Sequence, residues 1–131
     1  YEGLSMIAVS GLDMAAWDTL ARAANMPLCR LLGGSVGPVR AYNSNGLWLR
    51  EPSMLAEEAV ELRDEGGFTG LKLRMGRDEV NDDLATVDAV RGAIGDDIRL
   101  MVDFNQGLDL AEALERCHRI CLSVKNVGAT R

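Results

Sequence analysis

Long apolar runs, a basic leader and paired cysteines are all missing from this sequence. No apolar run approaches the roughly 20 residues that a membrane helix needs, so we expect no transmembrane segment. The opening residues, YEGLSMIAVSG, contain no basic cluster, so we expect no secretory signal peptide. The three cysteines, Cys29, Cys117 and Cys121, form no disulfide framework. These absences favour a cytoplasmic protein with reduced thiols.

Positive charge and histidine are also scarce. The net charge of −6 over 131 residues argues against a surface for nucleic acid or anionic membranes. The only histidine, His118, lies between Cys117 and Cys121. Three soft ligands fall short of the four that structural zinc prefers, so we expect no metal site there. What is present, 47% hydrophobic and 26% charged residues, is the composition of one ordinary globular core.

The first third of the chain reads as helical. Residues 4–25 are rich in Ala, Leu and Met around most of the helix circumference, which predicts a helix buried on most sides. Residues 27–34, PLCRLLGG, predict a short helix that ends at the two glycines. The glycine-rich stretch at 33–37 follows a helix rather than a strand, so it lacks the context of a phosphate loop.

Strands and helices then alternate. We expect strands within 39–44, 68–75 and 98–105, and helices that begin near Pro52, before Leu84 and at Asp109. The last helix carries an apolar stripe that we expect to be buried, formed by Leu110, Leu114, Cys117 and Cys121. The final residues, 121–131, show no helix pattern. Such alternation implies a parallel sheet, in either a (β/α)₈ barrel or a doubly wound fold.

Polar residues gather at the ends of two expected strands. Lys72 and Arg74 end one strand, and Asp103 and Asn105 end the next, each pair with the i, i+2 spacing that places two side chains on one face. Active sites of parallel α/β folds lie at this end of the strands. There the carboxylate can hold Mg²⁺, the cations a substrate carboxylate, and the amide a hydroxyl. Alternatively, these charges are solvated, or Lys72 and Asp103 form only a structural salt bridge.

Two residues near the first expected strand are weaker candidates. Ser44 has no histidine close in sequence and no nucleophile-elbow context, so its functional use would be as a hydrogen-bond donor. Trp48 is a packing group or lines the mouth of the sheet.

The sequence also resembles a known family. The stretches AVSGLDMAAWDTLARAANMPLCRLLGG, VRAYNSNG, GLKLRMG and GDDIRLMVDFNQGLD are similar to the mandelate racemase and muconate lactonizing enzyme group of the enolase superfamily, over about residues 6–120. The resemblance implies a TIM-type barrel and an enzyme that removes the proton α to a substrate carboxylate and stabilises the enediolate on Mg²⁺. Full-length members imply a small carboxylate or acid-sugar substrate and a homo-oligomer.

The resemblance assigns roles to residues. Asp103 matches the first metal ligand and Asn105 a neighbouring residue that contacts substrate. Lys72 matches the first lysine of a Lys-x-Lys pair beside the substrate carboxylate, and Ser44 a position that touches the same group. Arg74 departs from the family, because it replaces a lysine that acts as a base in the racemases. A guanidinium is a poor base, so Arg74 weakens the racemase interpretation and leaves open a dehydratase whose base is a histidine on a later strand.

The expected organisation is that of an internal fragment. Residues 1–38 would be a helical lead-in from the capping domain, 39–120 a partial barrel of about three βα units, and 121–131 an atypical tail. The family's other two carboxylate ligands are missing after residue 120, so we expect this chain alone to be inactive. Two alternatives remain open: a non-catalytic degenerate fragment, and a small doubly wound receiver-like domain with Asp103 as acceptor.

Overall fold

The computed structural model describes residues 3–128 of the chain, with side chains described up to residue 122. The chain divides into two compact units, Tyr1–Arg40 and Ala41–Arg131. None of the helices within the described residues is long and apolar enough to cross a membrane.

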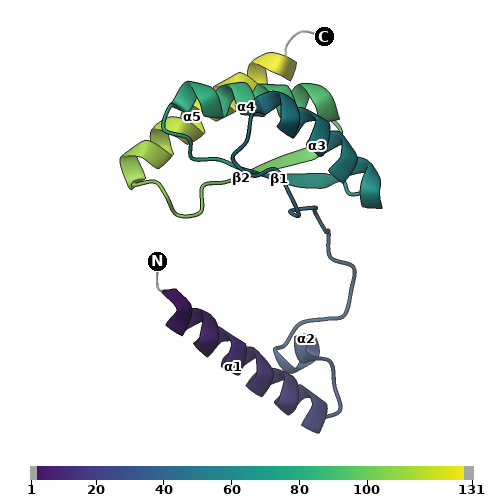
Figure 1. Ribbon diagram of the computed structural model, residues 1–131. Coiled ribbons are helices and arrows are strands. Elements are labelled where there is room, and N and C mark those ends of the chain that lie inside the picture. Colours follow the sequence, from purple (N-terminus) through teal and green to yellow (C-terminus); the bar gives the residue numbers. More distant parts are fainter. Residues whose placement is uncertain (1–2, 129–131) are drawn as a thin grey trace. The chain divides into compact units, whose positions relative to one another are not determined.

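The first unit consists of one long helix and one short one. Helix α1 (Gly3–Ala23) is followed by a turn and by α2 (Leu28–Leu31), as Figure 1 shows. Gly33, with φ +85°, follows α2 in the left-handed region that glycine adopts readily, and the Gly34 N–H donates to the Cys29 carbonyl at 2.7 Å. The predicted pair of helices and the glycine stop are therefore confirmed.

The prediction that the long helix is buried on most sides is wrong for this chain. Ala21 is the buried residue of α1, whereas Leu4 and Leu12 are 84% and 74% exposed. Within residues 3–40 the regular element available to pack on α1 is the four-residue α2, which is too short to cover a 21-residue helix. Composition indicates which faces are apolar, but burial also needs a partner surface.

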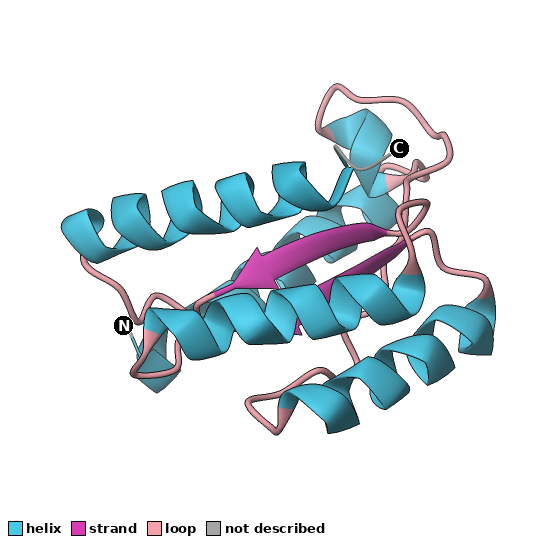
Figure 2. Cartoon of the chain, turned by 90° about the horizontal axis from the view of Figure 1, so that it is seen from above, coloured by secondary structure: helices cyan, strands magenta, loops and turns pink. Residues whose placement is uncertain are grey.

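The second unit is a small parallel sheet covered by helices. Its elements are α3 (Pro52–Gly66), β1 (Gly70–Arg74), α4 (Val80–Ile94), β2 (Arg99–Asp103) and α5 (Leu110–Gly128). The two strands pair in parallel (Figure 2), with Leu71 opposite Leu100 and Arg74 opposite Asp103. The three helices lie on one face of the sheet in Figure 1. This is the βαβ arrangement that the alternating pattern predicts.

The core lies between the sheet and these helices. The apolar residues of β1, Leu71 and Leu73, are fully buried there, and so are Leu55 and Ala59 of α3 and Val90 of α4. The helical periodicity therefore predicted the buried faces of α3 and α4 correctly. Because side chains alternate along a strand, Lys72 and Arg74 point to the opposite face, away from this core.

The first expected strand, within 39–44, forms only an isolated bridge. Asn43 pairs with Leu71 in parallel: its N–H donates to the Gly70 carbonyl at 2.9 Å, and its own carbonyl accepts from the Lys72 N–H at 3.0 Å. The pairing stops there because the Asn43 side-chain oxygen accepts from the Asn45 N–H at 3.0 Å, which turns the chain.

The last helix differs from the expectation in two ways. It continues to Gly128 instead of ending near residue 120. The stripe that we expected to be buried is exposed at Leu110, Leu114, Cys117 and Cys121, and Arg116 and Ile120 are buried instead. The buried face is rotated because Arg116 finds a buried carboxylate partner on α4. Residues 129–131 of the expected tail lie outside the described residues.

Candidate active site

Four polar side chains meet at the carboxyl ends of β1 and β2. The strand register places Arg74 directly opposite Asp103, and one Arg74 terminal nitrogen, Nη1, donates to Asp103 Oδ2 at 2.8 Å. The ammonium of Lys72 lies 3.2 Å from the same oxygen. Arg74 Nη1 also donates to the Asn105 side-chain oxygen at 2.6 Å. The predicted convergence of the two i, i+2 pairs is therefore confirmed.

Asp103 is held as a carboxylate. The backbone N–H of Asn105 donates to Asp103 Oδ1 at 2.9 Å, and this hydrogen bond, followed by the one from Lys72, lowers the pKa of Asp103 below its usual value of 3.8. Both groups stabilise the charged form more than the neutral one. The mouth of the sheet thus carries two cations and one anion at neutral pH.

The turn after β2 supports this arrangement. Asn105 and Gln106 have positive φ angles of 50° and 60°. Asparagine tolerates this left-handed region better than most residues. The turn brings the Asn105 N–H back to Asp103 and its side-chain oxygen to Arg74, so the asparagine fixes both charges at once.

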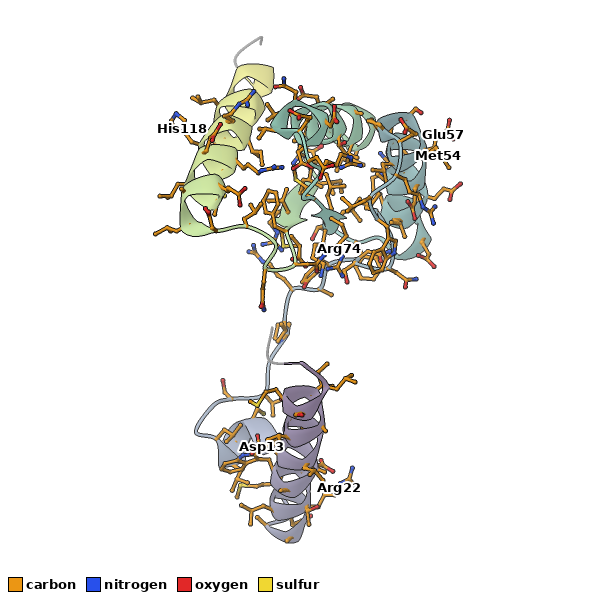
Figure 3. The ribbon with its side chains drawn as sticks, turned by 60° about the vertical axis from the view of Figure 1, so that its left-hand side comes forward. Asp13, Arg22, Met54, Glu57, Arg74 and His118 are labelled. Carbon is orange, nitrogen blue, oxygen red and sulfur yellow. The ribbon has the colours of Figure 1, made fainter. Side chains whose placement is uncertain are left out.

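Trp48 forms one wall of the site. The Arg74 guanidinium carbon lies 4.9 Å from the centre of the Trp48 ring, a cation–π distance, and the tryptophan is 52% exposed. The preceding residue, Leu47, is fully buried with a φ of 56°, and its carbonyl accepts from the Arg74 N–H at 3.0 Å. Figure 3 shows Arg74 at the edge of its unit. The sequence left two interpretations of Trp48, a packing group or a residue that lines the mouth of the sheet, and its position beside Arg74 is that of a residue lining the mouth.

Ser44 is the one candidate that is not joined to the cluster. It follows the bridge residue Asn43, whose side chain donates to the Leu62 carbonyl of α3 at 3.1 Å. Ser44 is half-buried and lies outside the strands, directly after the bridge at which the chain turns. Within residues 3–128, no hydrogen bond links its side chain to the four clustered residues.

A second polar cluster, which the sequence did not reveal, fixes the loop after β1. Asp83 of α4 is 1% exposed and pairs with Arg116 of α5 at 2.7 Å. Its carboxylate also accepts from the backbone N–H groups of Gly76 and Arg77 at 3.2 Å. The Arg77 side chain in turn donates to the Arg50 carbonyl. Helix periodicity marks Leu84 and Val87 as buried, but it gives no signal that an aspartate beside them is buried too.

This loop also borders an open cleft. The cleft has a volume of about 580 Å³ and lies between residues 49–52 and the segment 76–85. Its lining is of mixed charge, with Arg50 and Arg77 set against Glu51, Asp78 and Asp82. The cleft is therefore next to the strand ends, but none of the four clustered residues lines it.

His118, around which we expect no metal site, lies on an exposed surface. Cys117, His118 and Cys121 are all exposed on α5, and Figure 3 shows His118 on the outer side of that helix. Among residues 3–128, no three side chains of the His, Cys, Asp or Glu type are grouped closely enough to hold a metal ion.

Comparison with curated proteins identifies relatives that are longer than this chain. The chain is 38% identical over 112 residues to L-talarate/galactarate dehydratase of Salmonella typhimurium, covering 86% of this chain and 28% of the relative. It is 33% identical over 124 residues to arabinonate dehydratase of Saccharolobus solfataricus, covering 90% and 32%. The chain thus spans about a third of the length of these relatives.

Solved structures of the same kind superpose on this chain. An enolase from the alpha-proteobacterium bal199 with bound magnesium matches 90% of this chain and 33% of its own, with a TM-score of 0.73 and 65% identity. An enolase from Bradyrhizobium complexed with magnesium and mandelic acid matches 92% and 33%, with a TM-score of 0.71 and 41% identity. These matches decide between the two expected sheet types in favour of part of a TIM-type barrel.

Family profiles match both units. Residues 2–33 match the N-terminal domain of mandelate racemase/muconate lactonizing enzymes, and residues 54–125 match the enolase C-terminal domain-like family. The second match contains β1 and β2, and with them all four clustered residues. Lys72, Arg74 and Asp103 lie in the strands, and Asn105 lies in the turn after β2. From its sequence, its fold and these matches, the chain belongs to the mandelate racemase/muconate lactonizing enzyme family of the enolase superfamily.

Proposed function

We propose that this chain forms the substrate-carboxylate side of an active site that removes a proton α to a carboxylate, in an acid-sugar dehydratase. The observation that carries the proposal is the meeting of Lys72, Arg74, Asp103 and Asn105 at the ends of two parallel strands. Two cations on one face, 18% and 16% exposed at their side chains, are costly to keep together unless anions balance them. Asp103 balances one charge, and a substrate carboxylate would balance the other.

Each residue has a distinct part in this proposal. The Lys72 ammonium has three N–H groups and the Arg74 fork five, so both retain donors for an anion after binding Asp103. Asn105 would bond a substrate hydroxyl and Ser44 would contact the substrate carboxylate, the roles that the family resemblance implies for these positions. The Trp48 ring limits the space beside Arg74.

Arg74 bears on the choice between racemisation and dehydration. A racemase needs a base on each face of the substrate, and a guanidinium does not give up its proton at ordinary pH. Arg74 is instead a permanent positive charge that stabilises negative charge developing on the substrate. This argues against two-base racemisation and leaves open dehydration, with a histidine of a later barrel strand as the base, as the family resemblance implies; the relatives include dehydratases as well as epimerases and racemases.

Magnesium is bound in solved relatives, and when bound it stabilises negative charge on a substrate oxygen. The described residues of this chain do not fit such a site by themselves. They provide one carboxylate at the strand ends, and its Oδ2 is already within 3.2 Å of two cations. Mg²⁺ prefers near-octahedral coordination by several oxygens.

Direct binding of an acid sugar tests the proposal. Galactarate, a dicarboxylate, should shift the backbone amide resonances of Lys72, Arg74 and Asn105 in the ¹⁵N-labelled chain at millimolar concentration. The Lys72→Met variant should bind at least about tenfold more weakly, because an ion-paired hydrogen bond contributes about 1.5–3 kcal/mol.

Galactitol is the matched control ligand, since it has the same hydroxyl groups and no carboxylate. It should leave these resonances unchanged. If galactitol and galactarate produce equal shifts, or if neither affects the strand ends, the Lys72–Asp103 pair is only a structural salt bridge and the proposal is wrong.

A further inference from the structure

The guanidinium of Arg74 has one nitrogen left for a ligand. Its Nη1 donates to Asp103 Oδ2 at 2.8 Å and to Asn105 Oδ1 at 2.6 Å, which uses both hydrogens of that nitrogen. Its Nε is buried without a partner. Nη2 donates to no acceptor among the described residues. A bidentate carboxylate needs two neighbouring donor nitrogens, so an anion can bind this guanidinium through Nη2 alone.

Trp48 covers one face of the same guanidinium. The centre of its ring lies 4.9 Å from the Arg74 guanidinium carbon, although the tryptophan is 52% exposed. The face of an aromatic ring is its negative side, so the ring attracts the cation and partly compensates for the Nε–H that has no acceptor. A ligand is kept off this face and meets the guanidinium at its Nη2 edge.

The backbone before Trp48 is bent in a way that sets the ring against Arg74. Leu47 is fully buried with a φ of 56°, in the left-handed region that leucine rarely adopts. Its carbonyl accepts from the Arg74 backbone N–H at 3.0 Å, so the loop is tied to β1 at the arginine itself. Backbone in such sparsely populated regions persists where the surroundings hold it, and it is concentrated at functional sites.

We propose that Trp48 is a positioning residue for Arg74. It holds the guanidinium so that Nη2 faces an anionic substrate group, whose two oxygens are then shared between Arg74 Nη2 and the Lys72 ammonium. Lys72 lies 3.2 Å from Asp103 and has three N–H groups, so it keeps donors for the second oxygen. The inference rests on the proposed function in one respect, namely that a carboxylate binds these two cations.

The free chain tests the positioning without a ligand. In the ¹⁵N-labelled full chain, the Arg74 Nε–H resonance is identified by its loss in Arg74→Lys. It should lie upfield of the other arginine Nε–H resonances, because the proton lies over the Trp48 ring. Trp48→Leu should move it into their range, and Trp48→Phe, which keeps a ring, should move it less. Trp17→Leu, at the tryptophan of α1, is the matched control and should leave it unchanged.

A galactarate titration of the same variants tests whether the positioning serves binding. Trp48→Leu should weaken binding about three- to tenfold, the loss of one cation–π contact, and Trp48→Phe should weaken it less. In the Arg74→Gln background, which keeps N–H donors without the charge, Trp48→Leu should weaken binding no further. A tryptophan that only supports the fold would weaken binding equally in both backgrounds.

The inference is overturned if Trp48→Leu leaves the Arg74 Nε–H resonance in place, or if it weakens galactarate binding as much in the Arg74→Gln background as in the unmodified chain. Circular dichroism establishes that each variant is folded, and Trp48→Phe, with smaller changes of the same kind, replaces Trp48→Leu if it is not. If galactarate fails to bind the unmodified chain, the proposed function is wrong, whereas the Nε–H resonance still decides whether Trp48 positions Arg74.

Discussion

Replacing Asp83 by alanine should strongly destabilise the unit of residues 41–128. The aspartate is 1% exposed, and its carboxylate holds Arg116 at 2.7 Å and the backbone N–H groups of Gly76 and Arg77 at 3.2 Å. Truncation removes all of these acceptors and leaves the Arg116 guanidinium, whose side chain is 10% exposed, without its carboxylate and with only the backbone carbonyls of Arg77 and Asp78 as acceptors. Breaking a buried ion pair by removing one partner costs about 3–5 kcal/mol.

This loss is large compared with the stability of a small unit, which is about 5–15 kcal/mol for ordinary domains. With a urea dependence of about 2 kcal/mol per molar, a loss of about 4 kcal/mol lowers the unfolding midpoint by about 2 M. Urea unfolding followed by far-ultraviolet circular dichroism measures this shift. Asp83→Asn keeps one acceptor oxygen and should lose less, about 1–3 kcal/mol.

A matched control and a double variant show whether the reasoning is correct. Asp64→Asn, in an exposed pair with Arg63, should leave the midpoint unchanged within error. Adding Arg116→Met to Asp83→Ala should recover part of the lost stability, because the orphaned buried charge is removed. If Asp83→Ala shifts the midpoint no more than Asp64→Asn does, or if the two changes simply add, the buried pair does not stabilise the loop as described.

Three further predictions follow from the same structure. The Asn105 N–H and Lys72 lower the pKa of Asp103 below its ordinary value of 3.8. The stabilisation from the ionised Asp103 is therefore complete above pH 3.8 and is lost as the pH falls below it. Asp103→Asn should flatten the acid side of the curve of unfolding free energy against pH, measured by urea unfolding. The exposed apolar residues on α1 should make the chain self-associate on gel filtration. The double variant Leu4→Glu/Leu12→Glu should shift the chain toward monomer. If this variant associates as much as the unmodified chain, α1 is not the cause. The chain alone should catalyse no exchange of the α-proton of galactarate or mandelate with solvent deuterium, because Arg74 is no base and the described residues hold no metal cluster; measurable exchange by NMR would contradict both points.

Local rules determined much of the second unit. Pro52 begins α3 because its fixed φ suits the first helical position, and Gly67, with φ +62°, ends it. Asp109 and Glu112 form the predicted reciprocal cap of α5, with hydrogen bonds of 2.9 and 3.1 Å. The i, i+2 alternation of β1 placed Leu71 and Lys72 on opposite faces. Such features depend on residues within one or two turns of each other, so they can be read from sequence.

The contacts between distant segments were decided by tertiary structure. The i, i+2 spacing indicated that Lys72 and Arg74 share a face. Asp103 is 29 residues away from Arg74 in the sequence, and only the register between β1 and β2 makes the two residues partners. The apolar stripe of α5 predicted the wrong buried face, because Arg116 gains a buried carboxylate whose position depends on how α4 and α5 pack. Hydrophobic periodicity indicates which face of a helix is apolar enough to be buried. Which side chains are actually buried is decided by the surfaces that the rest of the fold presents to it.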